Sequence, residues 1–95
     1  MTVKEFLQGT YFMNLGQSIN HSSWQSAKMT LDKMRRTANE IGIHDFDHSF
    51  ISLNMLILNK NKNEALDLMA MITAKRVALL KRLEEENKRF KTNNN

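Results

Sequence analysis

The chain has 95 residues, of which 41% are hydrophobic, and a formal net charge of +4. This length suffices for one domain with a modest core, and the absence of cysteine excludes disulfide bonds, thiol catalysis and cysteine-based zinc sites. Three glycines and no proline favour long helices with short connections. No apolar run approaches the roughly 20 residues that span a bilayer, and the N-terminus has no signal-peptide pattern, so we expect a cytoplasmic protein without membrane association.

A first helix is predicted over about residues 3–20. Thr2 and Glu5 have the spacing of a capping box at its start. Its apolar residues form two slightly rotated stripes: Val3, Phe6, Leu7 and Tyr11, then Phe12, Leu15 and Ile19. Gly9 and Gly16 each weaken a helix by about 1 kcal/mol relative to alanine, so we expect this helix to be bent or frayed.

A second helix is predicted over about residues 23–41, and it is the best defined in the chain. Apolar residues recur at steps of three and four, which places them on one face: Trp24, Ala27, Leu31, Met34, Ala38 and Ile41. Ser22 or Ser23 can cap its start, and Gly42 can close its end.

A third helix is predicted over about residues 45–59, with His44 or Asp45 as its cap. Its inner stripe is Phe46, Phe50, Leu53 and Ile57. Further apolar residues widen this stripe, namely Ile51, Met55, Leu56 and Leu58. We therefore expect this helix to be buried on more than one side.

A fourth helix, the longest, is predicted over about residues 62–91. Its inner seam is Ala65, Leu68, Met69, Ile72, Leu79, Leu83 and Phe90. Its charged end, residues 81–91, is expected either to project beyond the other helices or to form a homodimer by packing on a second copy. Residues 92–95 are predicted to be a disordered tail.

Together these elements predict an all-α fold, an antiparallel up-down four-helix bundle that forms a single domain over residues 1–91. Short connections make consecutive helices antiparallel neighbours, which favours this arrangement. A three-helix bundle with a loosely attached first segment is the structural alternative.

The second helix also carries a pattern with functional meaning: Trp24, then Asp32, Arg35 and Arg36, and finally Ile41-Gly42. This spacing resembles the histidine phosphotransfer (HPt) domains of bacterial two-component signalling. In that family the corresponding positions hold an aromatic residue, the phosphoaccepting histidine, a lysine, a glycine and an apolar-Gly pair. The resemblance covers about residues 19–80 and implies a four-helix bundle that docks receiver domains.

Two departures change what the resemblance implies. Asp32 replaces the histidine nucleophile, and Arg36 replaces the glycine that gives the receiver room to approach. Asp32 and Arg36 are four residues apart and can form an ion pair on the helix surface. The chain is therefore expected to bind a receiver domain or another acidic protein surface without relaying phosphate. The predicted partner-binding residues on this face are Lys28, Asp32, Arg35, Arg36 and Asn39.

Other functions have weaker patterns. His44 and His48 could share a metal ion if both lay on one helix, but residues of these types also serve at helix starts, and we expect no metal site and no cofactor. No catalytic motif or phosphate loop is present, so neither an enzyme nor a small-molecule substrate is expected. One alternative function is a helical protein that self-associates through its long last helix and has no signalling role. Nine Lys and Arg stand against five Asp and Glu from residue 48 onward, which leaves a nucleic-acid accessory role as another alternative. Interleaved glutamates argue against that role.

Overall fold

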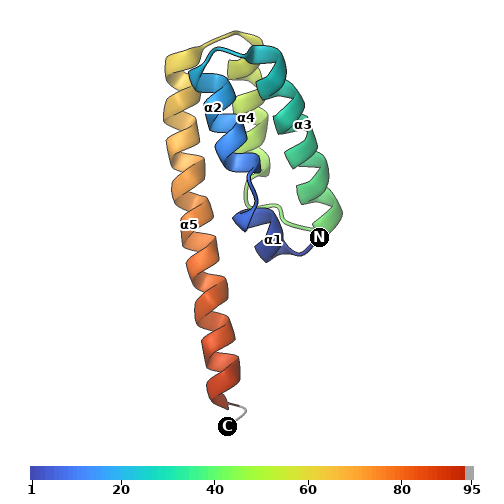
Figure 1. The fold of residues 1–95 in the computed structure, drawn as a ribbon, viewed down its shortest axis with the longest axis vertical. Helices are drawn as coiled ribbons and strands as arrows, with labels where there is room; N and C mark the ends of the chain where they lie inside the picture. Colours follow the sequence, from blue (N-terminus) through green and yellow to red (C-terminus); the bar gives the residue numbers. More distant parts are fainter. Residues whose placement is uncertain (94–95) are drawn as a thin grey trace.

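The computed structural model describes the backbone of residues 1–93 and the side chains of residues 1–88. It contains α-helices α1 (Val3–Gln8), α2 (Tyr11–Asn20), α3 (Trp24–Ile41), α4 (Asp47–Leu58) and α5 (Lys62–Asn93). The predicted antiparallel up-down four-helix bundle is confirmed, with α2 to α5 as its four helices (Figure 1). No described helix is long and apolar enough to cross a membrane.

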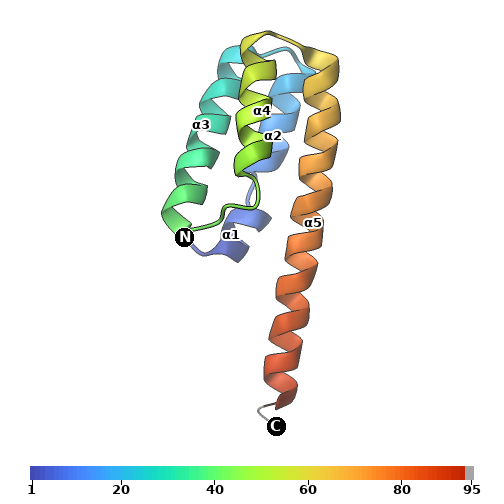
Figure 2. The ribbon, with the colours of Figure 1, turned by 180° about the vertical axis from the view of Figure 1, so that it is seen from behind.

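The four long helices form a ring in which α2 contacts α3, α3 contacts α4, α4 contacts α5, and α5 contacts α2. The short α1 lies at the end of the bundle where α3 connects to α4, and it packs on α3 and α5 (Figure 2). Beyond this end α5 continues alone (Figure 1), and the charged residues of its described side chains from 81 to 88 are exposed. It runs to Asn93, past the predicted end near residue 91. Residues 94 and 95 of the predicted tail, and the side chain of Phe90 in the predicted seam, lie outside the described part.

The first predicted helix is broken in two at Gly9. The Thr2–Glu5 capping box is present and holds the pKa of the Glu5 carboxyl below its usual range through hydrogen bonds from Thr2. Gly9 then ends α1 in an extended conformation, and α2 begins two residues later. In a continuous helix Phe6 and Phe12 would lie on well-separated faces, so both could not enter the same core. The break lets both enter the core, with their ring centroids 5.5 Å apart.

The core at this end is a chain of aromatic contacts. Phe12 lies 5.4 Å from Phe46, and Phe46 stacks on Phe50 at 5.3 Å with an interplanar angle of 12°. Phe46 occupies the N-cap position of α4, so the prediction that His44 or Asp45 caps this helix was wrong. The reason is burial: Phe46 is fully buried, and hydrophobic contact outweighs a polar cap at this position.

Two adjacent basic residues of α5, Lys75 and Arg76, contact the other elements at this end of the bundle. The Arg76 guanidinium donates a hydrogen bond to the Leu7 carbonyl at the end of α1 and lies 5.5 Å from the centre of the Phe12 ring. Lys75 donates to the Asp45 carbonyl, 2.8 Å away, in the connection between α3 and α4. The first segment is therefore firmly attached, which rules out the three-helix alternative.

The turns at the ends of α2, α3 and α4 share one hydrogen-bond pattern. In each, an amide donates back five residues: Ser23 to Ser18, Ile43 to Ala38, and Asn61 to Leu56. This is the Schellman motif, whose penultimate residue adopts the left-handed conformation that favours glycine. Gly42 occupies that position after α3, as predicted, but Ser22 and Lys60 occupy it after α2 and α4, with φ of 56° and 54°.

We predict that Arg76→Ala lowers the free energy of unfolding by about 2 kcal/mol, because it removes a charged hydrogen bond and a cation–π contact. Arg76→Lys should recover only part of this, since an ammonium cannot reproduce the planar guanidinium contacts. Urea denaturation measures both. Arg82 is exposed, so Arg82→Ala serves as the control and should change the free energy of unfolding by less than about 0.5 kcal/mol. Equal losses at positions 76 and 82 would contradict a stabilising role for the Arg76 contacts.

We predict that Ser22→Gly raises the free energy of unfolding by about 0.5 to 1 kcal/mol. Glycine removes the steric cost of the left-handed conformation, and its greater entropy in the unfolded chain offsets part of the gain. Gly42→Ala at the matching position after α3 should be destabilising by about 1 kcal/mol. Thermal and urea denaturation of both variants check the pair, and a Ser22→Gly variant less stable than the parent chain would refute the prediction.

Candidate docking groove

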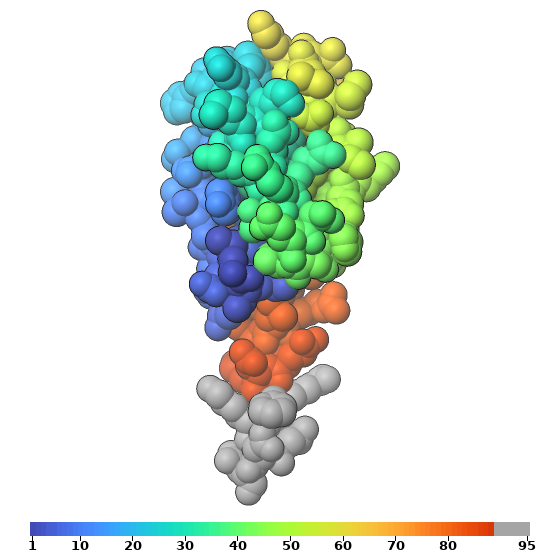
Figure 3. Space-filling model, turned by 90° about the vertical axis from the view of Figure 1, so that its right-hand side faces the viewer, coloured from blue at the N-terminus to red at the C-terminus, as the bar shows by residue number. Residues whose placement is uncertain are grey.

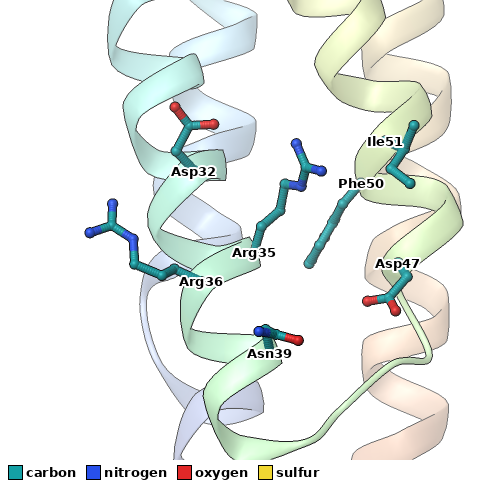
Figure 4. A pocket seen from close by; sticks show the side chains of 7 residues that line it. All are labelled: Asp32, Arg35, Arg36, Asn39, Asp47, Phe50 and Ile51. Carbon is teal, nitrogen blue, oxygen red and sulfur yellow. The ribbon is translucent and has the colours of Figure 1, made fainter.

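A groove of about 600 Å³ lies between α3 and α4 (Figure 4). Figure 3 shows the face of the molecule on which α3 (teal to green) lies beside α4 (yellow-green). The residues that line the groove are Asp32, Arg35, Arg36, Asn39, Asp47, Phe50 and Ile51. Four of the five predicted partner-binding residues are among them. The fifth, Lys28, lies one turn before the groove and contacts it through Asp32.

The α3 wall follows directly from helix periodicity. Asp32, Arg35, Arg36 and Asn39 are spaced by three and four residues, so they share one side of α3, next to its buried stripe. Gly42 has φ of 79° and ends the helix just after this face. The sequence alone therefore predicts this wall.

The α4 wall was not predicted. It consists of Asp47, the edge of the buried Phe50 and the half-exposed Ile51. The position of α4 against α3 depends on how the buried side chains of all the helices, Phe50 among them, pack in the shared core, and no spacing within one helix encodes that position. The only available signal was Ile51, an apolar residue outside the inner stripe of its helix.

The acidic side chains of the groove are already engaged. The Lys28 ammonium lies 3.4 Å from the Asp32 carboxylate, and both side chains are a little under half exposed. Asp32 was predicted to pair with Arg36, and among the described side chains it does not. Lys28 is partly buried and extends toward Asp32, whereas Arg36 is exposed and points away from it (Figure 4). Asp47, on the other wall, lies 2.9 Å from Nδ1 of His44.

The two arginines that line the groove differ from these acidic residues, because they have no described partner. Arg35 and Arg36 are exposed, and neither forms a hydrogen bond or an ion pair with any described residue. Arg35 extends across the groove toward Phe50, as Figure 4 shows. Arg35 thus presents a guanidinium without a described partner beside the almost fully buried Phe50, whereas Arg36 extends from the side of α3 that faces away from α4 (Figure 4). Guanidinium groups bind carboxylates and phosphates in a bidentate geometry, so this arrangement suits an acidic partner.

The second candidate site, the pair His44 and His48, does not form one helix face. α4 begins at Asp47, so His44 lies in the connection before it, where it bonds Asp47. Among the residues with described side chains, no three His, Cys, Asp or Glu gather as metal ligands. His44 therefore acts just before the start of α4, through its hydrogen bond to Asp47.

No protein-family model, curated protein or solved structure matches this chain. The resemblance to HPt domains therefore stands on the residue pattern of α3 and its neighbours, and function is argued from the groove itself.

We predict that Arg35→Glu and Arg36→Glu, introduced together, lower the free energy of unfolding by less than about 1 kcal/mol. Both side chains are exposed and form no ion pair with a described residue, and the new cost is repulsion between Asp32 and the carboxylate introduced at position 36. Phe50→Ala, on the floor of the same groove, should cost about 3 to 5 kcal/mol. Urea denaturation separates the two outcomes; a large loss from the arginine substitutions would show that these residues serve the fold.

Proposed function

We propose that the chain is a non-enzymatic helical protein-protein interaction module, a pseudo-HPt adaptor or regulator in bacterial signal transduction. The observation that carries this proposal is the pair of exposed arginines on α3, neither with a described partner: Arg35 extends across the groove toward Phe50, and Arg36 projects from the neighbouring surface of α3 (Figure 4). Interfaces commonly combine arginine with buried apolar and aromatic groups, and unpaired charges steer and orient an oppositely charged partner. A receiver domain is the acidic partner that the HPt resemblance suggests.

The same groove supports binding without phosphotransfer. Position 32, which corresponds to the phosphoaccepting histidine of HPt domains, holds a carboxylate bonded to Lys28. Phosphotransfer through that position requires an imidazole nitrogen as nucleophile, and a carboxylate does not supply it. Arg36 also occupies the position of the family's glycine, so a partner that docks here meets a long cation.

The proposal is tested by titrating the chain with receiver domains from its source organism. We expect one of them to bind, and the double variant Arg35→Glu/Arg36→Glu to weaken binding at least about tenfold, because like charges then face each other. The matched control is Lys81→Glu/Arg82→Glu, which makes the same change of charge on exposed residues of α5 and should leave binding within about twofold. Absence of binding to every receiver, or equal loss in both variants, would overturn the proposal.

Phosphotransfer is tested in the same preparation. When the chain is incubated with a phosphorylated receiver domain, we expect no stable label on His21, His44 or His48. Label on any of these histidines would contradict the assignment as a module that binds without relaying phosphate.

A further inference from the structure

The outer side of α4 is an exposed apolar stripe. Ile51, Met55 and Leu58 are spaced by four and three residues, so they follow one line along the helix. Their exposed fractions are 52%, 54% and 53%. The opposite side of α4 is buried in the core through Phe50, Leu53 and Ile57. This helix is therefore apolar on two sides, and the residues that the structure describes cover only one of them.

The stripe carries no charge. Residues 48–58 include no Asp, Glu, Lys or Arg, in a protein where a quarter of all residues are charged. The prediction that this helix is buried on more than one side is wrong for the single chain, because its outer face is left open. An uncharged apolar face of this kind on a small bundle marks an interaction surface.

Charges of opposite sign stand at the two ends of the stripe. Asp45 and Asp47 lie at the start of α4, and Lys60 and Lys62 follow its end. The Asp47 side chain remains 56% exposed beside His44, and Lys60 is exposed. Two copies of α4 in antiparallel orientation bring the acidic start of each against the basic end of the other, whereas parallel copies bring like charges together.

A single alignment of two antiparallel α4 helices pairs both their apolar stripes and their oppositely charged ends. The midpoint between Asp47 and Lys60 and the midpoint between Ile51 and Leu58 differ by about one residue, or about 1.5 Å along the helix. A two-fold axis near Asn54 and Met55 therefore aligns the apolar stripes and the charged ends at once. An isologous interface requires this self-complementarity of a single surface.

We propose that the occupant of the α4 stripe is a second copy of this chain, paired antiparallel about a two-fold axis near Met55. This interface differs from the predicted homodimer through the last helix, which stays untested. The described end of α5, residues 81–88, has Leu83 as its one apolar residue among six charged residues, and Leu83 already packs partly against the core. The α4 pairing extends beyond the docking function proposed above and does not depend on it.

Sedimentation equilibrium of the full chain between about 10 µM and 1 mM tests the proposal, because a single helix-pair interface is small and binds weakly. We expect a reversible monomer–dimer equilibrium. Met55→Lys should raise the dissociation constant at least about tenfold, since it buries an unpaired charge at the axis. Met13→Lys is the matched control: Met13 is 56% exposed on α2, across the bundle from α4, and its substitution should leave the dimer unchanged.

The antiparallel register has its own test. Asp47→Lys and Lys60→Glu should each weaken the dimer about threefold or more, and the double variant, which exchanges both charges, should return it to within about twofold. A monomer at 1 mM, or equal loss from Met55→Lys and Met13→Lys, would overturn the interface, and failure of the double variant to recover would overturn the antiparallel pairing. The receiver titration uses Arg35 and Arg36 instead, so the two proposals fail independently.

Discussion

The pair of stacked rings at the start of α4, Phe46 and Phe50, anchors this helix in the core through the contact of Phe46 with Phe12 of α2. Their rings lie 5.3 Å apart, and Phe46 also meets Phe12, so the start of α4 is held against the break between α1 and α2. Phe50 is at the same time the floor of the groove between α3 and α4. Because one side chain serves both core and groove, the height of α4 against Arg35 is set by core packing.

Helix periodicity accounts for what the sequence predicts well. Apolar spacing and Gly42 define α3, and the same spacing assigns Asp32, Arg35, Arg36 and Asn39 to one outer face. Residues on one helix share a face whatever surrounds them, so this wall of the groove needs no tertiary information. The opposite wall does need it, because contact between two helices depends on how their side chains interdigitate.

Local sequence preferences mispredict a helix boundary where burial of a side chain contributes more to stability than the preferred local contact does. A polar N-cap stabilises a helix by about 1 kcal/mol, whereas burial of a phenylalanine side chain is worth about 1.5 to 3 kcal/mol, so Phe46 takes the N-cap position of α4. The break at Gly9 has the same cause, since it admits both Phe6 and Phe12 to the core. The sequence carried a sign of this break in the rotation between the two apolar stripes of residues 3–20. That this rotation becomes a change in the direction of the chain at Gly9 is seen only in the folded structure.

The two-sided apolar character of α4 shows a further limit of sequence patterns. Apolar periodicity identifies a helix face that packs against other apolar groups, but it does not indicate whether those groups belong to the same chain or to another. Here Ile51 belongs to both surfaces, because it lines the groove and begins the exposed stripe. If an acidic partner and a second copy both bind, each occupies part of the area around Ile51. Any effect of dimerisation on partner affinity must then equal the effect of the partner on dimerisation, because the two equilibria share one thermodynamic cycle.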